Sequence, residues 1–495
     1  MRIHSVAALA LGAMGLTSFS VWNLTPLAAE AAADPPDFAT VAAADATEEL
    51  PDRSHFVAGA TLLLEGRLGH AQVPAQQGQS SYVFATINGA EGLVAPPSAL
   101  DLAIVVDTSG SMRGERMTNA LEAARGMVRR LRDQDRVTVI TYSTRANVLV
   151  PTTVINGLSR GRVIQQLSGM RAQGATCISC GLELALARVR GRSDRVSRIL
   201  LLSDGEATTG VRSDAGFQAI ARRSRSIGTT MSTVGVDIEY NARIMGALAQ
   251  HSNGHHYFVE HAHELRPVFD QEFDSLARTV ATDVELLVDL APGVEVERVF
   301  DREVRRLGNQ LVVPVGTVSP GEEKTFLVQV RVPAGEVGER PVANLRLRYQ
   351  DLVQRRPGEC EGTLAARGTD DLNAVSALDP FVAARVSRSV TLNGIREANE
   401  FSAHGDFAAA RRRLSESTAQ VGVLRSRAMA AAEPASEEAV AQQFGVQDQA
   451  LRGAGGGFSG AGLAAPAASP RGREARRRAR SQERLNADLA NPFAD

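Results

Sequence analysis

Lysine is nearly absent from this chain of 495 residues, in which Lys324 is the only lysine among 54 basic residues. The G-x-x-x-x-G-K-[ST] phosphate loop requires a glycine directly before its lysine, and Glu323 stands there instead. A Schiff-base mechanism would have a single candidate lysine. We therefore do not expect the chain to be a P-loop ATPase.

Aromatic residues and excess charge are scarce as well. Aromatic side chains make up 4% of the residues, which predicts cores built mainly from Ala, Val and Leu. The formal net charge of -2 gives the chain no general attraction to DNA or to anionic lipid. A hydrophobic fraction of 44% is typical of a globular chain, and this length has room for about two to four domains.

The N-terminus has the pattern of an export signal. Arg2 is followed by an apolar stretch from Val6 to Leu16 and by Ala29-Glu30-Ala31, whose alanines suit a cleavage site. This stretch is too short to cross a bilayer, although an extension to Leu27 leaves an uncleaved anchor as the alternative. The absence of cysteine before Cys177 excludes lipid attachment at a cysteine after the signal. We expect export to the periplasm or cell envelope, or secretion, and no transmembrane segment in the mature form.

Composition divides the chain into segments of different character. We expect a signal peptide (1–31), a linker (32–53), an N-terminal β segment (54–97), an α/β domain (98–279), a β-sandwich domain (280–355), a helical hairpin (372–430) and a disordered, low-complexity, Arg-rich tail (431–495).

The segment 98–279 alternates apolar strands with amphipathic helices. Leu100 to Val106 is almost continuously apolar, as expected for a strand covered on both faces. Glu115 to Arg132 has apolar residues at helical spacing. Further strands are expected at 136–142, 198–202, 231–236 and 256–259. The fold class is therefore predicted as α/β, with a doubly wound, mainly parallel sheet, and such sheets bind ligands at the carboxyl ends of their strands.

Three loops at that edge carry oxygen donors. Asp107, Ser109 and Ser111 follow the first strand, Thr176 precedes a helix, and Asp204 follows the strand 198–202. Two carboxylates about 5 Å apart repel each other by roughly 3 kcal/mol at an effective dielectric constant of about 20, so a bound cation would stabilise the cluster. Oxygen donors without thiolate or imidazole favour Mg²⁺, with Mn²⁺ or Ca²⁺ as substitutes.

The motifs in these loops resemble the metal-ion-dependent adhesion site of the von Willebrand factor type A (vWA) domain. They are D-T-S-G-S-M at 107–112, G-A-T at 174–176 and L-L-S-D-G-E at 201–206, in the order and at the spacing typical of that family. The resemblance implies that the metal is held directly by Ser109, Ser111 and Thr176, and partly through bound water by Asp107 and Asp204. It also implies that the ion, which the neutral hydroxyls do not neutralise, binds an Asp or Glu of a protein partner.

A simpler interpretation of the same residues remains. A serine of the first loop would cap the helix that starts near Glu115, and the two carboxylates would be solvated turn residues. One departure from the family also bears on the metal site. Ala175 stands where the family commonly has a second glycine, which could stiffen or shift the loop that carries Thr176.

Cysteine and histidine patterns give weaker signals. Cys177 and Cys180 are predicted either as a local disulfide or as two unpaired small residues, and a disulfide would restrain the neighbouring Thr176 loop. A redox enzyme would need a different βαβ context. Five histidines fall between His251 and His263, and His261-x-His263 could bind a transition metal, but no H-E-x-x-H occurs. Structural roles are the preferred interpretation of these histidines.

After Asp283 the apolar residues alternate with polar ones, which predicts a small antiparallel sandwich that the early strands at 60–65 and 82–87 could complete. A vWA domain bracketed by β segments resembles the layout of inter-alpha-trypsin inhibitor heavy chains and of calcium-activated chloride channel-like proteins. Helices at 378–399 and 406–427 predict a packing or docking hairpin rather than a repeat array. The arginines at 471–484 indicate either a solvated tail or contact with an anionic surface, and nothing supports sequence-specific nucleic-acid binding.

Two classes of function are compatible with these patterns. The first is an exported, non-catalytic binding protein whose Mg²⁺ captures an acidic side chain of a protein partner. The second is a hydrolase that uses the same ion as a Lewis acid, but the sequence has no G-x-S-x-G elbow and no phosphate-gripping lysine. An adaptor for a separate AAA-type ATPase is a further alternative, against which the export signal argues. We therefore predict a binding protein rather than an enzyme.

Overall fold

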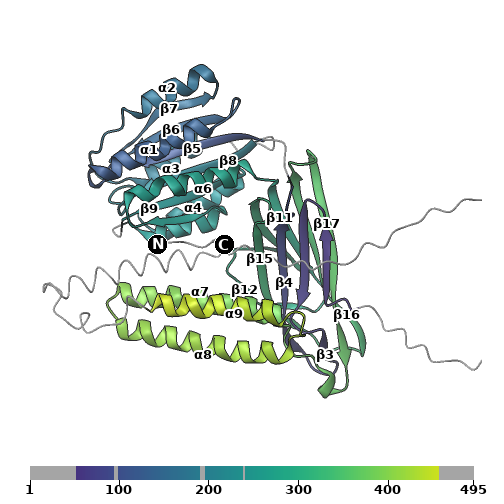
Figure 1. Cartoon of the computed structure of the whole chain (residues 1–495). Helices are drawn as coiled ribbons and strands as arrows, with labels where there is room; N and C mark the ends of the chain where they lie inside the picture. Colours follow the sequence, from purple (N-terminus) through teal and green to yellow (C-terminus); the bar gives the residue numbers. More distant parts are fainter. Residues whose placement is uncertain (1–51, 94–97, 190–194, 238–239, 456–495) are drawn as a thin grey trace, which may run out of the picture. The chain divides into compact units, whose positions relative to one another are not determined.

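A computed structural model of the chain describes residues 52–93, 98–189, 195–237 and 240–455 (Figure 1). The predicted signal peptide, all but the end of the predicted linker, and the run of arginines at 471–484 lie outside these residues. The described residues form an α/β domain, a β-sandwich that is antiparallel except for the pair β3 and β17, and a group of long helices.

The α/β domain is built on a six-stranded sheet in the order β10-β9-β8-β5-β6-β7. Neighbouring strands are parallel except for β7, which is antiparallel to β6. The predicted doubly wound, mainly parallel sheet is thus confirmed. The edge strand β7 was not predicted, because its exposed threonines and Pro151 interrupt the apolar pattern. The strands are β5 (Ala99–Asp107), β6 (Arg136–Tyr142), β7 (Ala146–Val154), β8 (Arg195–Ser203), β9 (Thr229–Val236) and β10 (His256–Val259).

Helices cover both faces of this sheet. Alternate residues of β5 point to opposite sides, so Ile104 packs in one core with Met127, while Val105 packs in the other core with Leu182. The first core contains α1 (Glu115–Arg130), α2 (Gly157–Leu167) and α6 (Leu265–Ala277), and the second contains α3 (Ile178–Leu186), α4 (Asp214–Ser226) and α5 (Ala242–Ser252). Burial on both faces explains why β5 is almost wholly apolar.

The sandwich consists of two sheets, in the orders β1-β2-β4-β15-β12 and β13-β14-β11-β16-β17-β3. Both sheets combine strands from before and after the α/β domain, which is therefore inserted between β4 and β11. The strands are β1 (His55–Gly59), β2 (Leu62–Leu68), β3 (Gln72–Pro74), β4 (Gln79–Gly89), β11 (Ala281–Leu290), β12 (Glu295–Phe300), β13 (Arg305–Leu307), β14 (Gln310–Val318), β15 (Glu323–Val332), β16 (Gly338–Asp351) and β17 (Arg356–Thr369).

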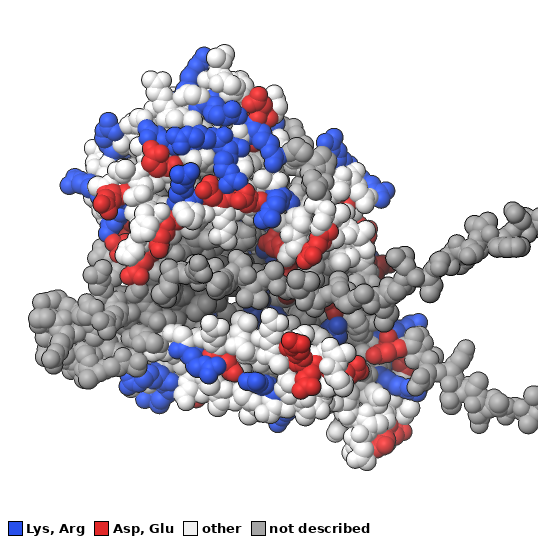
Figure 2. Space-filling view, viewed as in Figure 1, with Lys and Arg blue, Asp and Glu red and all other residues white. Residues whose placement is uncertain are grey.

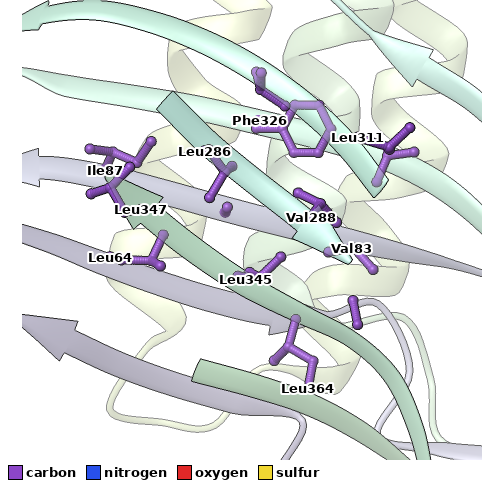
Figure 3. Packing of buried hydrophobic residues seen from close by; sticks show 14 of the residues in the cluster. Leu64, Val83, Ile87, Leu286, Val288, Leu311, Phe326, Leu345, Leu347 and Leu364 are labelled. Carbon is purple, nitrogen blue, oxygen red and sulfur yellow. The ribbon is translucent and has the colours of Figure 1, made fainter. Parts of the chain in front are cut away.

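One hydrophobic core joins the two sheets (Figure 3). Leu64 and Ile87 from the first part of the chain pack there with Leu286, Phe326 and Leu347 from the second. The N-terminal β segment and the β-sandwich that were predicted at 54–97 and 280–355 are therefore one structural unit. The sandwich also continues beyond residue 355, since β17 extends to Thr369.

Three long helices follow the sandwich, one more than predicted. They are α7 (Pro380–Ala403), α8 (Phe407–Ala431) and α9 (Glu437–Ala454). The prediction of a low-complexity tail from residue 431 is wrong for α9, which buries Val440, Phe444 and Leu451 in the helical core. Its high Ala and Gln content concealed this apolar stripe. None of the helices in the described ranges has the length and apolar character needed to span a membrane.

Surface charges of both signs are mixed on the side of the molecule that Figure 2 shows. Arginines alternate there with Asp and Glu among the coloured side chains, and neither sign forms one continuous field. This distribution agrees with the small net charge of the chain.

A buried ion-pair network connects the α/β domain to the sandwich. Glu272 of α6 is fully buried and lies 2.8 Å from Nη1 of Arg198 on β8. His255 places Nδ1 3.3 Å from Glu272 and Nε2 3.6 Å from Glu322, which in turn pairs with Lys324 of β15. Burial alone would raise the pKa of Glu272, but the charge of Arg198 and the hydrogen bonds from His255 and Ser232 outweigh it and lower that pKa to about 2.

Replacement of Glu272 by Ala should lower the free energy of unfolding by about 3 to 5 kcal/mol, because it leaves the Arg198 charge buried without its partner. Chemical denaturation followed by circular dichroism measures this loss, with Glu260→Ala, at an exposed position, as the control. Because the pKa of Glu272 is lower than its ordinary value of 4.5, its stabilisation should be complete above pH 4.5 and decline as the pH falls towards 2. Equal effects of the two variants would contradict the role of the network.

Candidate metal centre

The first loop of the candidate site starts where β5 ends. Asp107 is the last residue of β5 and is fully buried. One of its carboxylate oxygens accepts the backbone N–H of Ser109 at 2.8 Å, and the other accepts the hydroxyl of Ser203 at 2.9 Å. Both acceptor atoms are therefore fixed by the ends of two neighbouring parallel strands, β5 and β8.

Asp204 follows β8 and is almost fully buried. Its Oδ1 accepts the hydroxyl of Ser111 at 2.8 Å, and its Oδ2 accepts Nη1 of Arg116 at 2.9 Å. The hydroxyls of Ser109 and Ser111 are 2.9 Å apart. The structure thus brings Asp107, Ser109, Ser111 and Asp204 together in one hydrogen-bonded cluster at the carboxyl edge of the sheet.

Thr176 reaches this cluster through the backbone of its loop. Gly174 accepts the N–H of Gly110 at 3.1 Å, which joins the Thr176 loop to the first loop. The N–H of Thr176 donates to the hydroxyl of Thr208 at 2.9 Å, and the carbonyl of Thr176 accepts the N–H of Thr208, also at 2.9 Å. Thr176 is therefore fixed between the two loops that carry the aspartates, and it is 5% exposed.

A disulfide lies directly after Thr176 and restrains the loop that carries this residue. Cys177 and Cys180 are bonded at the start of α3, so the disulfide alternative of the sequence prediction is the one observed. Gly210 lies against the start of α3. Its φ is 74°, and a Cβ at that position would come within 2.6 Å of the Cys177 sulfur. The loop after Asp204 is therefore packed directly onto the disulfide. Cys360 is a free thiol whose pKa burial raises to about 11.

The electrostatics of the cluster favour a bound cation. Burial, reinforced by the negative charge of Asp204, raises the pKa of Asp107 to about 6 against the hydrogen bonds from Ser109 and Ser203. Burial also raises the pKa of Asp204, although the Ser111 hydroxyl and the Arg116 guanidinium oppose this. Arg116 is shared with Asp237, a third carboxylate. One arginine thus pairs with two carboxylates and leaves Asp107, among the described residues, without a countercharge of its own, and the hydroxyl and carboxylate donors fit a hard divalent cation.

Sequence reasoning missed three residues that hold the cluster. Ser203 lies directly before Asp204 in the motif at 201–206, but its hydroxyl binds the other aspartate. Arg116 lies in the first turn of α1, where the helical periodicity gives no sign of a contact with Asp204. Tyr142, at the end of β6, is fully buried and donates its hydroxyl to the carbonyl of Leu202 at 2.9 Å. No local motif marks these contacts, because each joins separate strands or loops.

The histidines between 251 and 263 have the structural roles that were preferred. The two rings of the H-x-H pair, His261 and His263, stack on each other with centroids 5.6 Å apart. His256 binds Thr233 and Tyr240 through its two ring nitrogens. Within the ranges that the structure describes, no three His, Cys, Asp or Glu residues are grouped so that they could hold a metal ion. A metal at the candidate centre would depend on the hydroxyl donors.

Comparison with known proteins identifies the class of the α/β domain. Residues 101–271 match the family model of the von Willebrand factor type A domain. The chain therefore contains a vWA domain, and the predicted resemblance is confirmed for this part of the sequence.

Relatives share more than this domain. An uncharacterized protein of Synechocystis is 28% identical over 51% of this chain and 62% of its own length. The uncharacterized protein YfbK of Escherichia coli is 28% identical over 47% of this chain and 42% of its own length. Human inter-alpha-trypsin inhibitor heavy chain H4 is 23% identical over 54% of this chain and 29% of its own length. The match thus spans less than two thirds of each of these relatives.

A solved structure extends the likeness of the fold to most of the chain. It is a von Willebrand factor type A protein from Catenulispora acidiphila, which is superimposed with a TM-score of 0.65 at 18% identity, over 90% of this chain and 99% of that one. At this identity the comparison establishes the shared fold alone.

Replacement of Arg116 by Gln should destabilise the metal-free protein, because buried Asp204 loses its countercharge. Arg116 is 26% exposed, so we expect a loss of about 1 to 2 kcal/mol rather than the larger cost of breaking a fully buried pair. Urea denaturation in EDTA measures the loss, and Arg113→Gln, at an exposed position nearby, is the matched control. An unchanged midpoint for Arg116→Gln would refute the role of this ion pair.

Proposed function

We propose that this chain is a non-catalytic binding protein whose vWA domain holds Mg²⁺ at Asp107, Ser109, Ser111, Thr176 and Asp204. The observation that carries the proposal is the cluster of serine hydroxyls with two buried carboxylates, of which Asp204 shares Arg116 with Asp237 and Asp107 accepts hydrogen bonds alone. A cation relieves the repulsion between the carboxylates. Mn²⁺ or Ca²⁺ are chemically acceptable substitutes.

The partner is a protein that offers an Asp or Glu side chain. Hydroxyl ligands carry no charge, so the bound ion keeps part of its positive charge and attracts an external carboxylate. Ser111 is exposed while Asp107 and Asp204 are buried, which gives a partner access to the hydroxyl side of the cluster. The ion would act as the contact point between two proteins.

Binding fits the cluster better than hydrolysis. Both carboxylates already accept hydrogen bonds, Asp107 from Ser109 and Ser203 and Asp204 from Ser111 and Arg116. Each carboxylate thus takes part in holding the loops of the cluster together. A metal-dependent phosphatase or esterase activity that Asp107→Ala abolishes would favour the hydrolase alternative instead.

Calorimetry should detect Mg²⁺ binding to the wild-type chain, and Asp107→Ala should weaken it at least about tenfold, because a charged ligand group is lost. Pull-downs from envelope extract in Mg²⁺ and in EDTA then test the partner. Asp133→Ala, which removes an exposed carboxylate, is the matched control in both assays. Equal recovery of partners under all conditions would reject metal-mediated capture.

We also propose export to the periplasm or cell envelope, in agreement with the disulfide between Cys177 and Cys180, because disulfides persist in oxidising compartments. Mass spectrometry of the chain from a periplasmic extract should find the mature N-terminus near residue 32 and a molecule without residues 1–31. An intact N-terminus in the cytoplasmic fraction would instead favour an adaptor for an AAA-type ATPase.

A further inference from the structure

A cavity whose chemistry differs from that of the metal centre lies at the opposite end of the vWA strands. Its volume is about 520 Å³, within the range of small-molecule sites. It is lined by the first residues of β8 and β9, the end of α4, and parts of β11, β13 and β14. The candidate metal centre is at the carboxyl ends of β5 and β8, whereas this cavity is at the amino ends of β8 and β9.

Arginines dominate the charge of this cavity. Four of them line it, Arg195, Arg222, Arg225 and Arg305, together with two carboxylates, Asp283 and Glu285. Arg305 is 3.4 Å from Glu285, and Glu303, which is not in the lining, pairs with Arg222 at 3.3 Å and with Arg225 at 3.6 Å. Even with Glu303 included, the arginines outnumber the carboxylates.

The arginine charges also act on one another. Burial lowers the pKa of Arg225, and the positive charges of Arg222 and Arg305 lower it further, against the opposing effect of Glu303. Arg195 donates to the carbonyls of Gln134 at 2.9 Å and Leu100 at 3.5 Å. These contacts hold its guanidinium in place without neutralising it, so the cavity keeps a positive potential.

The second observation is a group of buried hydroxyls without partners. In the described ranges, six buried Ser or Thr hydroxyls have no hydrogen-bond partner. Four of these six line this one cavity, namely Ser197, Thr229, Thr230 and Thr282, and their residues are at most 6% exposed. A buried hydroxyl without a partner is costly, and this concentration in one place points to a ligand that supplies acceptor oxygens.

We propose that this cavity binds a small tetrahedral oxyanion, phosphate or sulfate, either free or as a monoester. Arginine is the side chain best suited to such anions, because its planar guanidinium donates two parallel hydrogen bonds. Hydroxyl donors complete the coordination of the remaining oxygens. A metal ion is disfavoured by the surrounding arginines, and a neutral ligand would leave the excess positive charge uncompensated.

Isothermal titration calorimetry of the full chain with inorganic phosphate, sulfate and glycerol 3-phosphate, at constant ionic strength in chloride, tests the proposal. We expect saturable binding with a dissociation constant on the order of 1 mM or tighter. Tighter binding of glycerol 3-phosphate than of phosphate would identify a monoester as the ligand, and the reverse order would identify the free ion.

The variants form matched pairs. Arg305→Gln removes a cavity arginine and should weaken the binding of phosphate about fivefold. Its neighbour Arg306 is exposed on the same strand and lies outside the lining, so Arg306→Gln should leave the phosphate affinity unchanged. The double variant Thr230→Val and Thr282→Val should weaken the binding of phosphate about threefold, and its melting temperature should be unchanged or higher. Thr391→Val, at a buried unpartnered hydroxyl outside this cavity, is the control for that pair.

Absence of saturation up to roughly ten times the expected dissociation constant would overturn the proposal. So would equal weakening by Arg305→Gln and Arg306→Gln, which would mean that phosphate only screens surface charge. The proposal is independent of the metal centre, since Asp107→Ala should leave phosphate affinity unchanged. Should the double Thr variant fail to fold, the two arginine variants still decide the question.

Discussion

Two carboxylates are buried side by side at the end of a parallel sheet, and the arrangement of the surrounding loops follows from that constraint. Asp107 ends β5 and Asp204 directly follows β8, so the parallel order of these neighbouring strands brings their charges together. Each remaining group at this edge lowers the cost of that charge. Ser109, Ser111 and Ser203 donate hydrogen bonds, and Arg116 supplies a positive charge. The balance is incomplete, and the remaining negative charge is what suits the site to a cation.

The disulfide supports this edge of the sheet, and an ion-pair network joins the vWA domain to the sandwich. The vWA domain enters and leaves the sandwich through β4 and β11, and the network of Glu272, Arg198 and His255 ties α6 and β8 to the sandwich turn at Glu322. The disulfide at Cys177 acts more locally, on the Thr176 loop and on the loop that contains Gly210.

Much of the fold and the core of the candidate site could be predicted from the sequence because their signals are local. The apolar run of β5 and the D-T-S-G-S motif that follows it lie in one short stretch, and parallel strands bring such loops to one edge by topology alone. Arg116, Ser203 and Tyr142 could not be assigned in this way, because their partners are 88, 96 and 60 residues away in the chain. Helix α9 was missed for a different reason, since its alanine-rich composition resembles that of an unstructured tail.

The sequence by itself determined the α/β alternation, the candidate metal ligands and the close spacing of the two cysteines, since each depends on neighbours along the chain. Only the tertiary structure decided that segments on both sides of the vWA domain form a single sandwich, because the pairing of β4 with β15 joins residues more than 200 positions apart. The same applies to the cavity of arginines and hydroxyls. Its walls come from strands of two domains and from the end of α4, and no stretch of sequence contains enough of these residues to indicate it.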